Sequence, residues 1–232
     1  MDALRGLCIL AVVAVHFLYD LVDLYELVRW EYPDWFELLK NWGGTVFFLL
    51  SGLSVTLGSR SFRRGAIVFF CGMICTAVTW GMYRLDLAGR GMVIWFGALH
   101  CLGVCMILWP LFRKLPRLLT AAVATVLTAV GMYWQLTASW SRHIWLIPLG
   151  LPTLRFSSAD YFPLLPFFGF FLMGVVLGGV LYPQKRSLLP GKHEDWLPVR
   201  FLCLCGRNSL PIYLLHQPLL MGICAMLEMI LR

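Results

Sequence analysis

The first stretch of the chain, residues 1–23, limits the possible folds more than any other feature. It carries no charge from Leu7 to Val15 and is too apolar for a helix that faces water. It nevertheless carries Arg5, His16, Asp20 and Asp23. At about 100° per residue, an α-helix would place these four groups on one face and the aliphatic side chains on the others.

Ionisable groups inside a membrane are energetically costly, so they face the interior of a helical bundle or a water-filled cavity. Arg5 and His16 are separated by a rise of about 16 Å, whereas His16 and Asp20 are one turn apart and can touch. We therefore predict a polar track that begins at one membrane face and passes the middle of the membrane. The alternative is that Arg5 and Asp20 are interfacial anchors and His16 is a hydrogen-bonded core residue.

The composition predicts an all-α, polytopic membrane protein. Of the 232 residues, 60% are hydrophobic and 13% are charged, compared with about a quarter charged in soluble domains. We expect a single integral-membrane domain over residues 1–232. The net charge of +7 does not indicate nucleic acid, because the basic residues form short clusters between apolar segments, as in cytoplasmic loops. The eight cysteines lie within or beside apolar runs, which predicts small buried side chains and no metal site.

The N-terminal stretch is predicted to be a retained helix rather than a signal peptide. No small-residue cleavage site follows it, and Asp20 and Asp23 interrupt the expected pattern. The chain opens almost directly on Arg5, so we expect that a few preceding residues are missing from this sequence.

Seven apolar runs of about 20 residues predict seven transmembrane helices. They cover residues 3–25, 41–58, 65–83, 92–112, 118–137, 161–182 and 209–231. Residues 26–40 are predicted to lie at the membrane interface, and 183–200 to form a polar connection. The N-terminus and the even-numbered connections carry twelve of the nineteen Lys and Arg residues, including Lys185, Arg186 and Lys192. This asymmetry predicts a cytoplasmic N-terminus and an external C-terminus.

Three features in the middle of the chain have both a functional and a structural interpretation. Ser51 and Gly52 form a small polar notch in an apolar helix, which lets a ligand or simply another helix approach closely. His100, between two glycines, is either a site residue or a hydrogen-bonded core histidine. The turn with Arg60, Arg63 and Arg64 is either a topology signal or a phosphate-binding rim.

Two further motifs lie near the predicted outer face and in the last helix. Asp160 stands at a helix start, where a carboxylate can cap the helix. Pro211 and Pro218 are predicted to break the last helix and to free backbone carbonyls near His216 and Gln217. A broken helix at membrane depth is tolerated only where it is buried or lines a cavity.

Five segments, in chain order, carry a family resemblance: DALRGLCILAVVAVHFLYD, FFLLSGLS, FGALHCLG, DYFPLLPFFGFFLMG and SLPIYLLHQPLL. Together they resemble the small bacterial proteins grouped with the catalytic domain of heparan-α-glucosaminide N-acetyltransferase. The spacing of Arg5 and His16, with ten residues between them, also resembles the first-helix motif of the membrane acyltransferase-3 family. Both resemblances imply transfer of an acyl group from cytoplasmic acyl-CoA to a sugar-like acceptor across the membrane.

The resemblance is incomplete at one point. In the lysosomal heparan-α-glucosaminide N-acetyltransferase the catalytic histidine lies after the first helix, whereas residues 24–41 of this chain contain no histidine. The assignment of His16 therefore follows the acyltransferase-3 pattern and not the lysosomal one. The acceptor does not carry over either, and need not be heparan.

We therefore predict a multi-pass acyltransferase of the cell membrane that takes acetyl-CoA as its acyl donor and a saccharide or glycolipid as its acceptor. His16 would be the general base, Asp20 would orient its imidazole, and Arg5 would hold the CoA phosphates. An acetyl-histidine intermediate is the variant mechanism. Further CoA-binding candidates are Arg60, Arg63, Arg64, Ser51 and Gly52. Candidates for acceptor binding are Asp23, His100, Asp160, His216 and Gln217.

Two other classes of protein remain as alternatives. A proton-coupled transporter also uses buried His and Asp groups as relays, although the chain shows no internal repeat of the kind many transporters have. A structural membrane protein would leave the polar helix face unexplained. Membrane lipid is an expected partner, no nucleic acid is expected, and association of several copies is left open.

Overall fold

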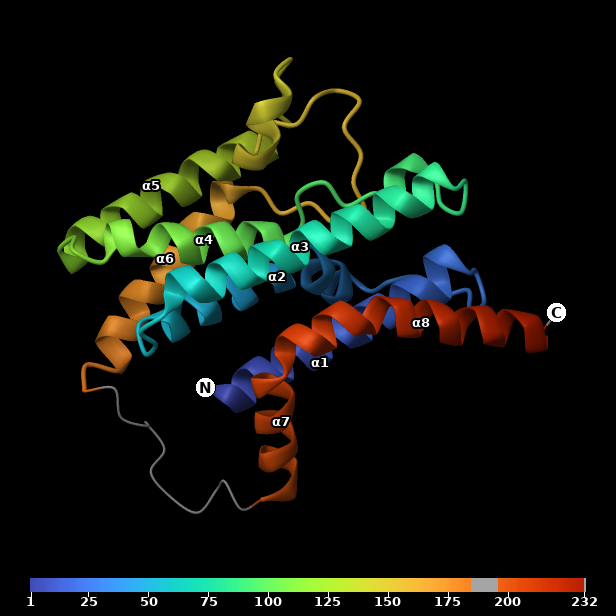
Figure 1. Cartoon of the computed structure of the whole chain (residues 1–232), viewed down its shortest axis with the longest axis horizontal. Coiled ribbons are helices and arrows are strands. Elements are labelled where there is room, and N and C mark those ends of the chain that lie inside the picture. The colour runs from blue at the N-terminus through green and yellow to red at the C-terminus, as the bar shows by residue number, and fades with distance from the viewer. Residues whose placement is uncertain (185–195, 232) are drawn as a thin grey trace. The chain divides into compact units, whose positions relative to one another are not determined.

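The computed structural model describes residues 1–184 and 196–231, without the side chain of residue 41, and in these residues the fold is all-helical (Figure 1). The described chain contains no β-strand, only an isolated bridge between Phe96 and Tyr161. This confirms the predicted all-α class. The basic residues Lys185, Arg186 and Lys192, which contributed to the predicted orientation, lie outside the described residues.

The chain divides into two compact units. One consists of Met1–Phe47 together with Leu189–Arg232, and the other of Phe48–Leu188. Helix α2 (Asp34–Val55) begins in the first unit and ends in the second. That the whole chain acts as one domain stays a prediction.

Five helices of the described chain are long and apolar enough to cross a membrane. They are α1 (Asp2–Tyr19) with its continuation η1 (Asp20–Leu24), α3 (Ser61–Arg84), α5 (Arg117–Leu136), α6 (Leu164–Leu181) and α8 (Ser209–Leu231). Two shorter apolar helices, Trp42–Val55 within α2 and α4 (Ala98–Phe112), match the remaining predicted spans. The seven apolar segments were therefore located correctly, while a count of seven crossings stays a prediction.

Three details differ from the sequence prediction. Helix α4 starts about six residues later than expected. Arg90–Met92 form the short 3₁₀ helix η2, Gly97 is extended, and the Phe162 amide donates to the Phe96 carbonyl (3.0 Å). Part of the predicted interfacial stretch is helical, since α2 begins at Asp34 with two acidic residues in its first turn, where they favour the helix dipole. The polar connection ends in an additional helix, α7 (Leu197–Arg207), with a proline in its first turn.

The prediction that prolines break the last helix is wrong. Helix α8 is continuous from Ser209 to Leu231. Pro211 lies in its first turn, where the missing N–H has no intrahelical partner to lose. Pro218 lies inside the helix without ending it.

In the first unit, α7 packs closely against the beginning of α1 through two glycines. A Cβ atom on Gly6 would overlap the carbonyl of Leu202, and one on Gly206 would overlap the carbonyl of Asp2. Helix α8 then follows α1 in the same direction, from the Arg207–Asp2 contact to the hydrogen bond of the Tyr25 hydroxyl with the Met221 carbonyl (Figure 1). Parallel first and last spans agree with an odd number of membrane crossings.

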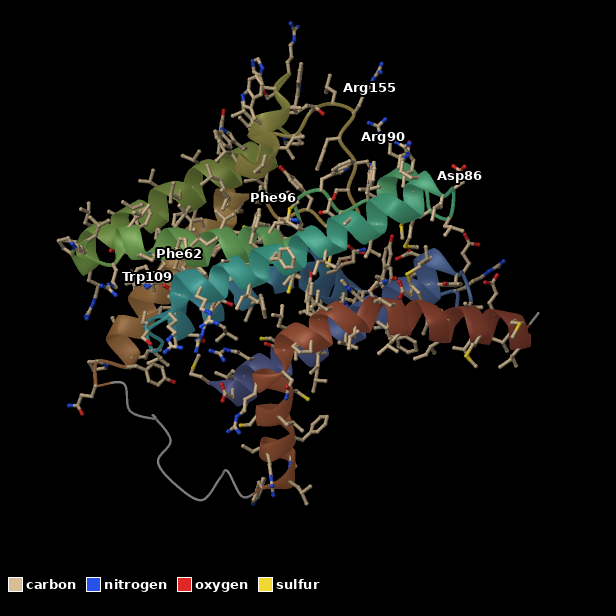
Figure 2. All side chains as sticks on the ribbon, viewed as in Figure 1. Phe62, Asp86, Arg90, Phe96, Trp109 and Arg155 are labelled. Atoms are coloured by element: carbon tan, nitrogen blue, oxygen red, sulfur yellow. The ribbon has the colours of Figure 1, made fainter. Side chains whose placement is uncertain are left out.

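In the second unit, small residues bring the helices together. Gly52 of α2 lies against the Phe171 carbonyl of α6, and α3 runs antiparallel to α4, with Gly72 against the His100 ring. Phe62 and Trp109 lie at one end of this helix pair, whereas Asp86 and Arg90 belong to its other end (Figure 2). The eight cysteines form no disulfide, and four of them are buried, as expected for small apolar side chains: Cys101, Cys105, Cys205 and Cys224.

Candidate active site

A polar cluster joins α1 and its continuation η1 to α8 in the first unit, with two of its four side chains buried and two half-buried. It contains His16, Asp20, His216 and Gln217, which we call the HDHQ cluster. The rings of His16 and His216 stack with centroids 4.9 Å apart and an interplanar angle of 18°. The Gln217 Nε2 donates to both oxygens of Asp20, at 3.0 and 3.1 Å. Two residues one turn apart, on α1 and at the start of η1, thus meet two adjacent residues on α8.

Asp20 is the most deeply buried member of the cluster. Its side chain is 0% exposed, and in the described part of the chain no Lys, Arg or His forms an ion pair with it. A carboxylate without a cation is costly to bury, even with the hydrogen bonds from Gln217. Such a group inside a membrane helix indicates function rather than stability.

Asp20 also begins a π-helical turn, which changes the direction of the residues that follow. The Tyr25 amide donates to the Asp20 carbonyl (2.9 Å), an i→i+5 bond. Asp23 is consequently exposed and accepts a hydrogen bond from the Tyr32 hydroxyl (2.8 Å). Burial and then this bond to Asp23 raise the pKa of Tyr32 well above its usual range. The prediction of one polar face holds for His16 and Asp20 but is wrong for Asp23.

The hydrogen bonding of His216 determines which of its nitrogens is free. Its Nδ1 lies 2.6 Å from the carbonyl of Tyr213, and a carbonyl can only accept, so Nδ1 carries the hydrogen. In the neutral ring the lone pair is therefore on Nε2. That nitrogen is buried and has no hydrogen-bond partner among residues 1–184 and 196–231.

Three buried polar atoms of the cluster lack a partner within the described chain: His16 Nδ1, His216 Nε2 and Gln217 Oε1. Each such atom typically costs about 1–3 kcal/mol, and native structures contain few of them. Elsewhere the described residues have only two, the hydroxyls of Thr45 and Thr128. Three at one place indicate a site built for a polar ligand.

Asp20 was predicted to orient the imidazole of His16, but in the structure it makes no hydrogen bond to His16 Nδ1. The Asp20 carboxylate is held by Gln217, and His16 Nδ1 has no partner in the part of the chain described. The ring of His16 is instead positioned by its stack with His216. The sequence pattern predicted only acceptor binding for His216 and Gln217, because nothing in the sequence reveals which helix packs on α1.

Arg5 lies about three turns before His16, in a small charged group at the start of α1. Its Nη1 is 3.2 Å from Asp2 Oδ1, and the Nε of Arg207 is 3.3 Å from Asp2 Oδ2. Two guanidinium groups therefore share one carboxylate. Arg207, at the end of α7, was not predicted from the sequence as a site residue.

The two other acceptor-binding candidates, His100 and Asp160, belong to the second unit and have structural partners at the start of α4. The Gly97 amide donates to His100 Nδ1 (3.2 Å), which leaves Nε2–H to donate to the Thr76 hydroxyl (3.2 Å). Asp160 Oδ2 accepts from the Ala98 amide (2.9 Å). His100 thus fits the alternative of a hydrogen-bonded core histidine, and Asp160 caps α4 rather than α6.

The remaining CoA-binding candidates also belong to the second unit. Gly52 is buried against α6, which fits simple helix packing, and Ser51 is half-buried beside it. Arg60, Arg63 and Arg64 are exposed at the start of α3. Because α3 and α4 are antiparallel, the exposed residues Arg113 and Lys114 lie at the same end of the unit.

One comparison with known proteins identifies a family. A family model described as "Heparan-alpha-glucosaminide N-acetyltransferase, catalytic" matches residues 1–218, which include every member of the HDHQ cluster. No curated protein and no solved structure matches the chain. The described residues contain no group of three or more His, Cys, Asp or Glu side chains that could hold a metal ion.

Proposed function

Because the chain belongs to the heparan-alpha-glucosaminide N-acetyltransferase catalytic family, we propose that it moves an acetyl group from cytoplasmic acetyl-CoA to a saccharide acceptor on the other side of the cell membrane. At the coarser level the protein is a membrane acetyltransferase of a family that acts on saccharides. The donor, the direction of transfer and the catalytic residues are the proposed part.

The observation that supports this function best is the HDHQ cluster with its three unpartnered polar atoms. Acyl transfer needs a group that removes a proton from the attacking hydroxyl or amine, and histidine performs this task most often. We assign it to His16, whose ring is fixed by the stack on His216 while its Nδ1 remains unpartnered within the described chain.

The charged group at the start of α1 supports the proposed position of CoA. Arginine matches the bidentate geometry of phosphate, and Arg5 and Arg207 lie together around Asp2. Arg5 is about 16 Å of helix rise from His16, which suits a donor whose phosphates and thioester are far apart. The exposed arginines at the start of α3 are a second candidate for phosphate binding, or a topology signal.

The proposed reaction starts when the acceptor oxygen or nitrogen attacks the thioester carbonyl carbon, while its proton moves to His16. The bond between carbon and sulfur then breaks, and CoA leaves. In the variant mechanism, His16 itself is first acetylated and the acceptor attacks this intermediate. Trapping of an acetylated protein in the absence of acceptor distinguishes the two.

The test is acetyl transfer by purified protein in vesicles, with labelled acetyl-CoA and a panel of envelope saccharides. We expect a labelled saccharide with the wild-type protein. His16→Ala should slow transfer by a factor of about 10² to 10⁴, the typical contribution of a general base, while CoA still protects the protein against heat. His143→Ala, an exposed histidine stacked on Trp145, is the matched control.

Two results would contradict the proposal. No labelled product with any acceptor, from protein that CoA does not stabilise, would exclude the acetyltransferase function. Normal transfer by His16→Ala would leave the function in place but move the base to another residue.

A further inference from the structure

The stacked pair of His16 and His216 offers two imidazoles where the proposed reaction so far uses one. The rings come from different helices, and their centroids are 4.9 Å apart. Two protonated rings at this separation would repel each other, since like charges in a poorly solvated site interact strongly. The pair therefore holds one proton more readily than two.

His216 is anchored in a way that suits a residue that gains and loses a proton. Its Nδ1–H donates to the Tyr213 carbonyl, and this bond persists whether or not Nε2 is protonated. The ring can thus exchange a proton at Nε2 without rotating. That atom is buried and unpartnered in the described chain, which leaves it free to meet a reacting group.

Acyl transfer from a thioester needs two proton movements, one at the attacking atom and one at the departing sulfur. Enzymes commonly divide such tasks between two titratable groups in different environments. His16 and His216 differ in this respect: Nδ1 of His216 is bonded to a backbone carbonyl, whereas Nδ1 of His16 has no partner within the described residues.

We infer that His216 is a second catalytic residue, the general acid that protonates the CoA sulfur while His16 takes the proton of the acceptor. This inference rests on the proposed function and deepens it. Before the reaction His16 is neutral and His216 carries the one proton of the pair at Nε2. The acceptor forms its bond to the acetyl carbon, the carbon–sulfur bond breaks, His16 receives the acceptor proton, and His216 gives its proton to sulfur.

After the reaction His16 carries the proton and His216 is neutral, so the pair still holds one proton. Loss of that proton from His16 to water and uptake of a proton by Nε2 of His216 restore the starting state. The products are the acetylated acceptor and CoA with a free thiol, and no further reactant is required.

The test varies the leaving group of the acetyl donor. His216→Asn retains a side-chain amide that can donate to the Tyr213 carbonyl but carries no titrating nitrogen. With acetyl-CoA, we expect single-turnover transfer to fall by a factor of about 10² to 10⁴. With an acetyl thioester of an aromatic thiol, whose thiolate leaves without a proton, the loss relative to wild type should be at least tenfold smaller.

His16→Ala should show a similar loss with both donors, and His143→Asn should transfer normally with both. An equal loss with both donors in His216→Asn, or no loss, would overturn the assignment of His216.

If His216→Asn does not fold, two experiments replace it: transfer by His216→Gln, and transfer by the wild-type protein from a series of acetyl thioesters. A wild-type rate that depends steeply on the acidity of the leaving thiol would also overturn the assignment, and wild-type protein inert toward every donor would overturn the proposed function as well.

Discussion

Gln217 donates hydrogen bonds from one amide nitrogen to both carboxylate oxygens of Asp20, at 3.0 and 3.1 Å. This contact joins residues 197 positions apart in the chain and holds α8 against α1 at the depth of the HDHQ cluster. Asp20 is fully buried and has no cationic partner among the described residues. The hydrogen bonds from Gln217 therefore offset part of the cost of burying its carboxylate.

Gln217→Ala should therefore destabilise the protein by about 1.5–3 kcal/mol, the usual contribution of a hydrogen bond to a charged group. Thermal unfolding in detergent measures the change. Gln135→Ala, at an exposed position of α5, is the control and should change little. The double variant Asp20→Ala/Gln217→Ala should lose less stability than the sum of the two single variants, because it contains no buried carboxylate without a partner.

Replacing Arg5 and replacing Asp2 should have opposite effects on the affinity for CoA. Removing the guanidinium in Arg5→Ala should weaken binding by roughly 10- to 100-fold, as expected for lost charge-assisted hydrogen bonds. Asp2→Ala should strengthen it, because Arg5 and Arg207 no longer share a carboxylate. Arg5→Lys keeps the charge but loses the forked geometry and should lie between. Equilibrium binding of labelled CoA measures these affinities. Equal affinities of the wild-type protein and Arg5→Ala would mean that Arg5 is only a topology anchor.

Asp160→Ala should reduce stability and leave the chemistry intact. The carboxylate accepts a hydrogen bond from the Ala98 amide at the start of α4, and loss of such a cap typically costs about 1 kcal/mol. Thermal unfolding should shift, while single-turnover transfer per folded molecule should stay at the wild-type rate. A selective loss of saccharide binding would instead support the acceptor role that the sequence analysis predicted.

Gly206→Ala should disrupt the packing of α7 on α1. The added Cβ would overlap the carbonyl of Asp2, so the helices must separate, at a typical cost of about 1–3 kcal/mol. Gly222→Ala, in α8, is the matched control, because a Cβ there has no atom within 4 Å. Alanine should even favour the helix at that position, by about 0.5–1 kcal/mol. Thermal unfolding of the two variants side by side gives the comparison.

Orientation in the membrane follows from the distribution of the basic residues. A reporter fused to the C-terminus should be found outside the cytoplasm, and one inserted at residues 59–64 inside it. The parallel course of α1 and α8 is consistent with this arrangement. Labelling in the opposite sense would reverse the proposed positions of donor and acceptor.

The sequence by itself determined the class of the protein, the locations of its apolar helices and the shared face of His16 and Asp20. Each of these depends on composition or on helical periodicity, which are properties of one segment at a time. The family resemblance also follows from local motifs, and the matching family model confirms it.

Only the tertiary structure decided which groups meet. Periodicity reveals the polar side of α1 but not the helix that covers it, so the stack of His16 on His216 and the bonds from Gln217 to Asp20 could not be predicted. The π-turn at Asp20 turns Asp23 outward, because hydrogen bonding there departs from the α-helical period assumed for the sequence. His100 likewise finds its partners in residues that the fold brings to the start of α4. Contacts between distant segments depend on packing, and local sequence patterns do not encode which partner is chosen.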